Sequence, residues 1–521
     1  MTKIADYFSI DLNKSLSTYL LTACFVAIAI ATSYRLGAKS IWYDEAISAF
    51  YIRQSFLAIA QMSLLDYVPP LYYWVLKIYS NIFGISEVAL RSLSVIFNLG
   101  AAVYFWKLVK NHFGERASLY ALVFFGTSNY LLLRAQTIRA YPLFLLLTIA
   151  SIYYFFRAIE EDKNRLWFLY SLSMLCSLYS LYIGIATVVT MSIFVTLSAA
   201  KKFMPWHRKW LLWTISSVVG FLPWAILIKI TQPSPHPDWM ATTLPSLNLW
   251  TDFLILFINF FATDIIKESQ YGTLLSGLLL LIVGLLGIYS LVTWRGNDRA
   301  RKVLLFVCLS FPISVFVNYI LDFYASVNFL TLYRYVFLCP FAYLVAATGI
   351  SKLRFKTLQV LLLGALILPN VMAIRQTYTE PSMEEWRGFT RFIEINLRDN
   401  DLIIFSPGYM NIAFDFYAST DHLEIGYPKG LMSPSRLYWG YHNMRAPKEA
   451  EEFLLKNLSL VKRSERIWLV LSHNVVFDRD KIIFDTSMID TFNNIPLTKL
   501  EYITFNGIIV FLLTNLSPKT R

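Results

Sequence analysis

The sequence predicts a polytopic α-helical membrane protein with about eleven transmembrane helices, followed by an extracytoplasmic α/β domain. The first observation is composition: the 521 residues are 56% hydrophobic and only 15% charged, too apolar for a soluble protein of this size. The second is that apolar runs of near-spanning length recur up to residue 375 and then stop. We therefore expect a transmembrane domain at 1–375 and a soluble domain at 376–521.

The net charge of +12 is unevenly distributed along the chain. Residues 376–521 carry 16 Lys/Arg and 18 Asp/Glu, so the basic excess lies in residues 1–375, between the apolar runs. Basic residues in that position report membrane topology. The soluble part lacks the basic face that nucleic-acid binding needs, which excludes a nucleic-acid partner. The four cysteines have neither metal-ligand nor disulfide spacing.

The expected spans follow the apolar runs in order. The first covers 16–34 and is expected to stay uncleaved. A more polar surface segment at 35–86 follows, with surface helices expected at 45–61 and 70–82. The remaining spans are expected at 87–106, 117–133, 140–156, 166–181, 183–199, 210–230, 272–294, 303–321, 331–350 and 357–374. The run at 250–262 is too short to cross, so we interpret it as interfacial or re-entrant.

Basic clusters occupy alternate connections between these spans, and the positive-inside rule makes those connections cytoplasmic. The opposite connections, 35–86, 231–249 and 322–330, then lie outside, as does the soluble domain. We expect a multi-pass protein of the cell membrane with a cytoplasmic N-terminus. The clusters contain Lys107, Lys110, Arg116, Arg157, Lys163, Arg165, Lys201, Lys202, Arg208, Lys209, Arg295, Arg299, Arg301, Lys302, Lys352, Arg354 and Lys356.

The soluble domain reads as a small α/β fold. Ser382 begins a capping-box pattern, and the helix after it carries Trp386, Phe389, Ile393 and Leu397 on one face. Strands are expected at 402–405, 467–471, 500–505 and 508–513. The last two are separated by Asn506-Gly507, a strong β-hairpin signal.

The clearest candidate for chemistry is the acidic pair Asp44-Glu45, directly after the first span and flanked by Trp42 and Tyr43. An aromatic setting at the membrane surface suits a sugar site. The alternative is that Asp44 only caps a helix N-terminus. Neighbouring residues of a helix point about 100° apart, so we expect only one of the two carboxylates to face a substrate.

Three arginines, Arg134, Arg139 and Arg334, lie on the outward side, against the charge bias. Guanidinium groups bind phosphate oxygens in a bidentate manner, so a lipid-linked phosphate in the outer leaflet would compensate them. The alternative is that each arginine snorkels to headgroups or pairs with a carboxylate. Asp66 precedes Pro69-Pro70 at the expected start of a surface helix, where structural capping competes with a role in binding.

Several of these features follow one another in an order that resembles a known family. They are Asp44-Glu45, Pro70-Leu71-Tyr72-Tyr73, Phe83-Gly84 with Glu87 and Arg91, Gln136-x-x-Arg139-x-Tyr141, and Arg334-Tyr335 with Pro340. The chain resembles the GT-C glycosyltransferases of the protein mannosyltransferase and lipid A aminoarabinose transferase group, family 39, over about residues 15–375. Val68 stands where many members have His before Pro-Pro.

The resemblance implies a sugar donor on a polyprenyl phosphate and places the family's acidic residue after the first span at Asp44, with Glu45 at the next acidic position. It implies Arg139, Arg334 and Tyr335 at the donor phosphate, and we add Arg134 from its position. We assign substrate binding to Trp42, Asp66, Tyr72, Gln136 and Tyr141.

The expected reaction is inverting transfer to a hydroxyl of a lipid, glycan or protein acceptor, with Asp44 as general base. Since arginines can neutralise the phosphate, we expect no metal or other cofactor. The alternative function is a transporter or flippase of lipid-linked sugars, which predicts charges at the membrane midplane and repeated halves. We find neither feature in the sequence.

Overall fold

The computed structural model describes residues 2–66, 68–231, 256–261, 272–325, 332–426, 456–457, 459–461, 463–472, 475–478, 481–484 and 497–515. Most of the expected outer connections at 231–249 and 322–330 lies outside these residues. The chain forms two compact units. The helical unit contains Met1–Leu36, Tyr67–Gln232 and Thr243–Glu380, and the sheet unit contains Gly37–Asp66, Pro233–Thr242 and Pro381–Arg521.

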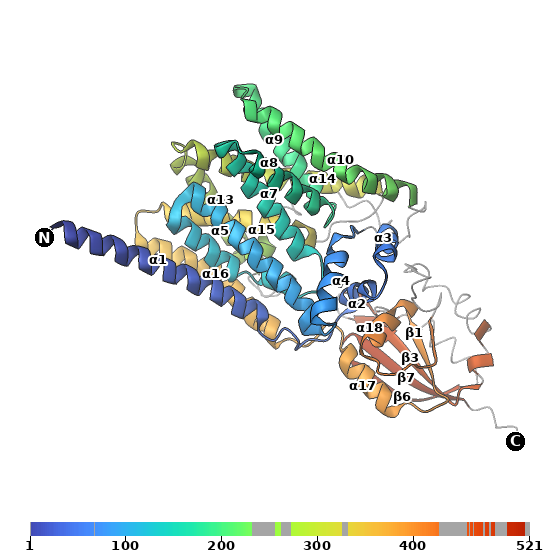
Figure 1. The fold of residues 1–521 in the computed structure, drawn as a ribbon. Coiled ribbons are helices and arrows are strands. Elements are labelled where there is room, and N and C mark those ends of the chain that lie inside the picture. Colours follow the sequence, from blue (N-terminus) through green and yellow to red (C-terminus); the bar gives the residue numbers. More distant parts are fainter. Residues whose placement is uncertain are drawn as a thin grey trace, which may run out of the picture. The chain divides into compact units, whose positions relative to one another are not determined.

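The helical unit is built from long apolar helices (Figure 1). In the part of the chain that is described, eight helices are long and apolar enough to cross a membrane, as expected for a multi-pass membrane protein. The elements of this unit are α1 (Thr2–Ser33), α4 (Leu71–Phe83), α5 (Glu87–Gly126), α6 (Asn129–Ala135), α7 (Tyr141–Glu161), α8 (Asn164–Leu178), α9 (Gly184–Lys201), α10 (Pro205–Thr231), α13 (Gly272–Thr293), α14 (Asp298–Ala325), η1 (Leu332–Leu338), α15 (Cys339–Ser351) and α16 (Lys356–Thr379).

These helices follow the spans expected from sequence, with three differences in detail. The span expected at 331–350 begins as the 3₁₀ helix η1, before α15. Helix α5 joins two expected spans, and the chain turns between them at Gly114, whose φ of 84° favours glycine. The expected span at 117–133 is interrupted at Thr127 and Ser128, where Ser128 caps α6 by accepting the N–H of Leu131. The predicted polytopic helical fold is confirmed.

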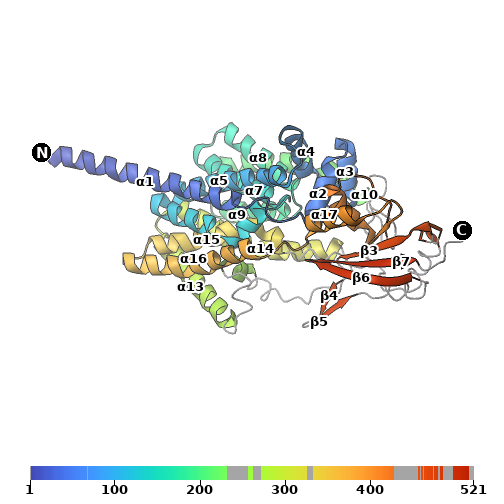
Figure 2. The ribbon, with the colours of Figure 1, turned by 90° about the horizontal axis from the view of Figure 1, so that it is seen from below.

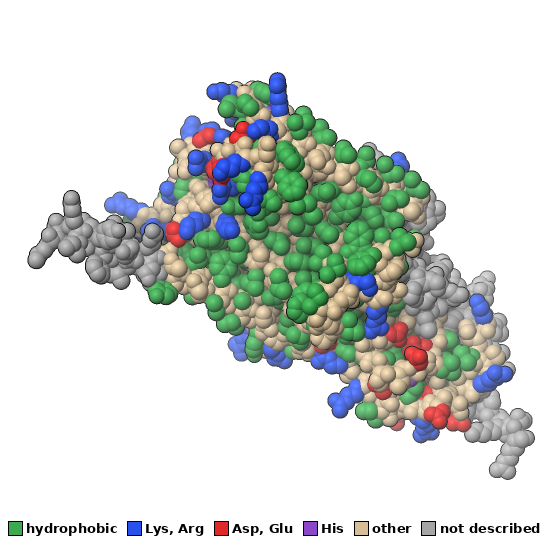
Figure 3. Space-filling model, viewed as in Figure 1, with side chains coloured by type: hydrophobic (Ala, Val, Ile, Leu, Met, Phe, Trp, Pro, Cys, Tyr) green, Lys and Arg blue, Asp and Glu red, His purple; other side chains and the backbone are tan. Residues whose placement is uncertain are grey.

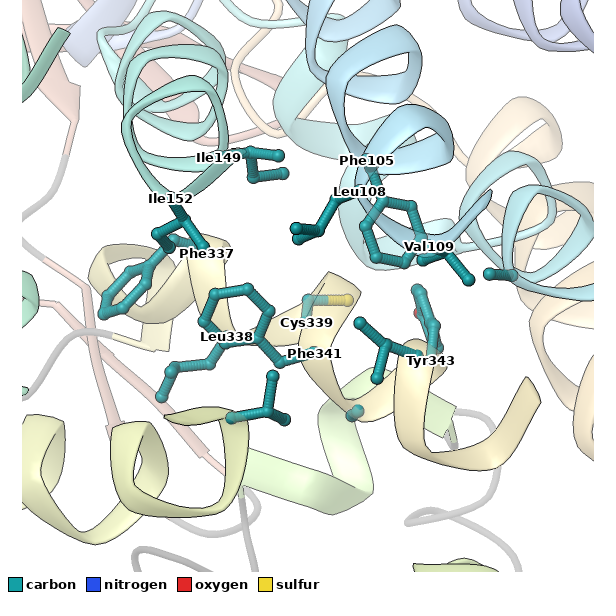
Figure 4. Packing of buried hydrophobic residues seen from close by; sticks show 14 of the residues in the cluster. Phe105, Leu108, Val109, Ile149, Ile152, Phe337, Leu338, Cys339, Phe341 and Tyr343 are labelled. Atoms are coloured by element: carbon teal, nitrogen blue, oxygen red, sulfur yellow. The ribbon is translucent and has the colours of Figure 1, made fainter. Parts of the chain in front are cut away.

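The core of the helical unit lies where α5, α7, η1 and α15 meet. Figure 4 shows Phe105 and Leu108 of α5 facing Ile149 of α7, with Phe337 and Phe341 beside them. Aromatic rings fill much of this core, so the four elements interlock through large rigid side chains. This packing fixes η1 against α7.

The outer surface of the helical unit is apolar. Figure 3 shows a broad area of hydrophobic side chains over this unit, with Lys and Arg side chains gathered towards its edges. On α10, for example, Leu212, Val219 and Ile230 are exposed. A continuous apolar area of this extent is typical of a surface whose solvent is hydrocarbon.

The sheet unit combines a five-stranded sheet with short helices. The sheet order is β2-β1-β3-β7-β6, with β2, β1 and β3 parallel and β3, β7 and β6 antiparallel; β4 and β5 form a separate two-stranded ladder (Figure 2). The elements are α2 (Tyr43–Ile52), α3 (Phe56–Leu65), α17 (Trp386–Asn396), β1 (Leu402–Ser406), η2 (Gly408–Met410), α18 (Asn411–Tyr417), β2 (Glu424–Gly426), β3 (Arg466–Ser472), β4 (Val475–Asp478), β5 (Lys481–Phe484), β6 (Leu497–Phe505) and β7 (Ile508–Asn515).

The four strands expected from sequence are confirmed as β1, β3, β6 and β7. The expected hairpin is confirmed too: Phe505 pairs with Ile508 across the two-residue turn Asn506-Gly507, and Gly507 has a φ of 72°. Helix α17 buries Trp386, Phe389 and Ile393 as the amphipathic pattern predicts.

The predicted capping box at Ser382 is wrong. Helix α17 begins at Trp386, and its N-cap is Glu385, whose side chain accepts the N–H of Gly388 at 3.3 Å. Ser382 Oγ instead accepts the backbone N–H of Ser40 at 3.0 Å. A contact between distant segments has replaced the local one.

The surface segment at 35–86 is divided between the two units. The helix expected at 45–61 forms as α2 and α3, because Ser55 accepts the N–H of Ala58 and begins a second helix. Both short helices belong to the sheet unit, whereas α4 belongs to the helical unit. The domain boundary expected at residue 375 stays a prediction.

Candidate active site

The acidic pair lies in the first turn of α2. This helix begins at Tyr43, and its N-cap residue is Trp42, whose side chain makes no capping bond. The alternative that Asp44 is the N-cap residue is therefore wrong. Asp44 is half-buried and Glu45 is 1% exposed. Two carboxylates at this position interact favourably with the helix dipole, and Asp44 is the more accessible of the two.

A distant glutamate supplies the cap that α2 lacks. Glu384 Oε2 accepts the backbone N–H of Tyr43 at 3.0 Å and the indole N–H of Trp386 at 2.6 Å. The pKa of Glu384 is raised to about 7, mainly by burial and to a smaller extent by the charges of Asp44 and Glu45, while the two hydrogen bonds act in the opposite direction. The capping-box pattern marked Glu384 only as a helix residue, so sequence reasoning missed its contact with α2.

Asp66 lies at the C-terminal end of α3, the short helix that follows α2. It is the C-cap residue of α3, and its Oδ2 accepts the hydroxyl of Tyr51 at 3.0 Å. The side chain thus ties α3 to α2 inside the sheet unit. This contact gives Asp66 a structural function, and its predicted part in substrate binding stays a prediction.

In the helical unit, Arg134 lies between two tyrosines. Its guanidinium carbon is 5.8 Å from the ring centre of Tyr130 and 5.9 Å from that of Tyr141, within the range of cation–π attraction. The structure therefore brings together two residues, Arg134 and Tyr141, that the sequence singled out separately.

Arg139 and Arg334 lie on neighbouring elements of the same unit. Arg139 is in the bend that precedes α7, Arg334 is in η1, and both are half-buried. The two elements touch through Phe144 and Phe337, whose ring centres are 5.5 Å apart. Arg139 thus directly precedes α7, and Arg334 lies in η1, two elements that are held together by aromatic packing. Tyr335, next to Arg334, is buried.

Gln136 has a structural contact that its motif did not predict. Its side-chain amide donates to the carbonyl oxygens of Thr32 and Tyr34, both at 3.0 Å, at the C-terminal end of α1. These carbonyls have no partner within the helix, so the amide acts as a cap. Tyr72 is fully buried, with its ring edge-on to Tyr73. The substrate-binding assignments of Gln136 and Tyr72 stay predictions.

The candidate residues are divided between the units: Trp42, Asp44, Glu45 and Asp66 are in the sheet unit, and the others are in the helical unit. Within the described ranges, no group of three or more His, Cys, Asp and Glu side chains is placed to hold a metal ion. The chemistry that these residues offer is that of an accessible carboxylate on one unit and guanidinium groups on the other.

Comparison with known proteins identifies the fold. Residues 67–228 match the family model of dolichyl-phosphate-mannose-protein mannosyltransferase. The structure is similar to ArnT from Cupriavidus metallidurans in the apo state, with a TM-score of 0.63 and 12% identity over 96% of this chain and 98% of that one. The chain has the GT-C fold. The resemblance to GT-C glycosyltransferases inferred from sequence is confirmed.

Two further structures share the GT-C fold. ArnT from the same organism, bound to undecaprenyl phosphate, is similar with a TM-score of 0.61 and 12% identity over 94% of this chain and 98% of that one. The Archaeoglobus fulgidus oligosaccharyltransferase in complex with Zn and sulfate has a TM-score of 0.51 and 12% identity over 94% of this chain and 72% of that one. The search of curated proteins found no match.

The family match and the GT-C fold cover the candidate residues differently. Arg134, Gln136, Arg139 and Tyr141 fall inside the matched residues 67–228. Asp44 precedes that range and Arg334 follows it, and the fold similarity covers 96% of the chain.

Proposed function

We propose that this protein is a membrane glycosyltransferase that moves a sugar from a polyprenyl-phosphate donor to a hydroxyl group of a lipid, glycan or protein. The observation that carries the proposal is the position of Asp44: an accessible carboxylate in the first turn of a short helix, in a chain with the GT-C fold. The solved complex of ArnT with undecaprenyl phosphate supports a lipid-linked donor.

In the proposed reaction, Asp44 acts as a general base. It accepts the proton of the acceptor hydroxyl as that oxygen forms a bond to the anomeric carbon of the sugar. The bond from the anomeric carbon to the phosphate oxygen breaks, and the polyprenyl phosphate leaves with the electron pair. A single displacement inverts the configuration of the anomeric carbon.

Arg139 and Arg334 stabilise the leaving phosphate. Negative charge on the phosphate oxygens grows as the bond breaks, and guanidinium groups held by rigid elements act on that charge without reorganising. A positioned base contributes roughly 10²–10⁴-fold to the rate, so charge stabilisation is a necessary second contribution. No metal is required in this scheme.

The reaction takes place on the outer face of the cell membrane. The alternation of basic connections supports a cytoplasmic N-terminus and an outer location for Asp44 and for residues 376–521. ATP and nucleotide-sugars are absent from that side, which favours a lipid-linked donor.

The proposal is tested with the purified full chain in lipid nanodiscs. The donors are undecaprenyl phosphates that carry radiolabelled hexoses or pentoses, and an envelope extract supplies the acceptor. We expect label transfer by the wild type, a loss of about 10²-fold or more in Asp44→Asn, and unchanged binding of undecaprenyl phosphate in that variant. Asp399→Asn, which changes an exposed aspartate of the sheet unit, is the matched control. Full transfer by Asp44→Asn, or lipid movement without transfer, contradicts the proposal.

A further inference from the structure

The segment before the candidate base is held by residues from the far end of the chain. The Ser40 N–H donates to Ser382 Oγ at 3.0 Å, and Ser40 Oγ accepts the backbone N–H of Arg387 at 3.0 Å. The backbone N–H of Ile41 donates to the hydroxyl of Tyr417 at 2.8 Å. These contacts fix the path of the chain as it enters α2, which packs against α18 in the sheet unit (Figure 1).

Glu384 completes this arrangement at the helix itself. The first N–H groups of a helix have no intrahelical acceptor, and the usual solution is a side chain at the N-cap. Trp42 cannot supply an acceptor, and Glu384 accepts the N–H of Tyr43 in its place. Tyr43 immediately precedes Asp44, so the position of the Glu384 carboxylate determines where the first turn of α2 begins.

The β6–β7 turn packs against the residues on either side of Glu384. The Glu385 N–H donates to the Asn506 carbonyl oxygen at 2.9 Å, and the Asn506 side chain donates to the Ser382 carbonyl oxygen at 3.3 Å. A Cβ atom on Gly507 would lie 2.5 Å from the Met383 carbonyl oxygen and 3.1 Å from Glu384 Cγ. The turn is thus packed directly against the residues that carry the carboxylate.

We propose that Glu384 is a positioning residue, through which the C-terminal sheet holds the first turn of α2 and thereby places Asp44 for proton transfer. This inference rests on the proposed function. It assigns the C-terminal domain a part in the chemistry itself, in addition to any part in choosing the acceptor. Glu384 acts through Tyr43 and α2 and does not touch the substrate.

Three properties of Glu384 fit this function. Its side chain is 5% exposed, so packing and the indole of Trp386 restrict its rotamers. The carboxylate accepts a hydrogen bond from the backbone N–H of Tyr43. This donor is present with any residue at position 43 except proline. The Tyr43 ring packs on Tyr409, with ring centres 4.8 Å apart, which adds a second contact of α2 with the C-terminal part of the chain.

The test compares two variants of Glu384 in the full chain in nanodiscs. Glu384→Leu removes the acceptor, and we expect kcat to fall about 10- to 100-fold because the base is misplaced, while KM for the lipid donor changes little. Glu384→Gln keeps a carbonyl acceptor for the Tyr43 N–H, and we expect it to recover most of that loss. Binding of undecaprenyl phosphate is expected to stay at the wild-type level in both.

Glu385→Leu is the matched control. Glu385 is the residue next to Glu384, and its side chain caps α17. Its replacement removes that cap, so we expect a lower melting temperature and an unchanged kcat. A wild-type kcat in Glu384→Leu overturns the inference, and so does a Glu384→Gln variant as slow as Glu384→Leu. A kcat loss in Glu385→Leu equal to that in Glu384→Leu assigns the effect to general destabilisation and also overturns it.

A second variant keeps the inference testable if Glu384→Leu does not fold. Gly507→Ala keeps the Glu384 side chain chemically unchanged but forces Met383 and Glu384 to move. We expect a lower kcat with unchanged undecaprenyl phosphate binding. Wild-type turnover in Gly507→Ala would then overturn the inference. The proposed function fails separately, when the wild type transfers no sugar or Asp44→Asn keeps full activity.

Discussion

Asn370 Oδ1 accepts the backbone N–H of Asn129 at 3.0 Å, and this hydrogen bond joins α16 to the start of α6 inside the helical unit. The same Asn370 side chain donates to the carbonyl oxygens of Phe260 and Phe261 at 3.3 and 3.4 Å. These two carbonyls end the described helical segment 256–261, which belongs to the run interpreted from sequence as interfacial or re-entrant. Buried backbone carbonyl groups away from water need such partners.

Asn370→Leu is expected to destabilise the helical unit. Asn370 is 3% exposed, so the substitution removes a buried partner of the Asn129 N–H and of the Phe261 carbonyl. The Phe260 carbonyl keeps its hydrogen bond from the Tyr343 hydroxyl at 2.7 Å. Such a loss costs about 1–3 kcal/mol for each group that stays unsatisfied. The measurement is the melting temperature of the full chain in detergent. Val371→Leu, at an exposed neighbour on α16, is the control, and equal melting temperatures for the two variants would contradict the prediction.

Arg139 and Arg334 are expected to bind the donor phosphate. Replacing either by Gln removes charge-assisted hydrogen bonds of about 1.5–3 kcal/mol, which corresponds to a loss of about 10- to 100-fold in affinity. The measurement is the Kd for undecaprenyl phosphate in nanodiscs. Arg295→Gln, at an exposed residue after α13, controls for the change of net charge. Wild-type affinity in both Arg139→Gln and Arg334→Gln would exclude them as phosphate ligands.

Stability of the sheet unit is expected to fall as pH rises through the titration of Glu424 on β2. The pKa of Glu424 is raised from an ordinary 4.5 to about 8, mainly by burial and to a smaller extent by the charges of Asp415 and Asp421. The folded protein therefore holds a proton that the unfolded chain has lost, so this stabilisation is complete below pH 4.5 and is lost towards pH 8.

Glu424→Gln removes that dependence. Its free energy of unfolding relative to wild type should rise by about 1.4 kcal/mol per pH unit across that window. Thermal unfolding of both proteins between pH 5 and pH 8 measures the difference. Glu501→Gln, at an exposed glutamate of β6, is expected to show no such trend. A pH-independent difference for Glu424→Gln would show that the carboxyl does not titrate in this range.

Transfer is expected to continue after metal chelation. Guanidinium groups neutralise the phosphate in the proposed mechanism, so EDTA should leave the rate of sugar transfer within about twofold of the untreated rate. The control is the same preparation with added Mg²⁺ or Mn²⁺, which should not accelerate it. Loss of transfer in EDTA with recovery on adding either ion would contradict the metal-free mechanism.

Local patterns predicted much of the fold. The Asn506-Gly507 hairpin and the strands beside it were identified because their signals lie within a few residues of one another. The interruption of the surface segment at Ser55 also had a local signal, a capping residue after Arg53 and Gln54, but the apolar spacing on both sides concealed it. The error at Ser382 arose because a capping pattern competes with tertiary partners.

The sequence by itself determined that this is a helical membrane protein with an acidic pair after its first span. In hydrocarbon, every backbone group of a span must be hydrogen-bonded within the span, so each span is a helix. Its side chains must be apolar, so a long apolar run in the sequence identifies each helix. The tertiary structure alone decided that α2 is capped by Glu384, at a sequence separation of 341 residues from Tyr43. Glu384 reaches Tyr43 only because distant segments of the chain pack together, and the residues near Tyr43 in the sequence do not indicate this contact.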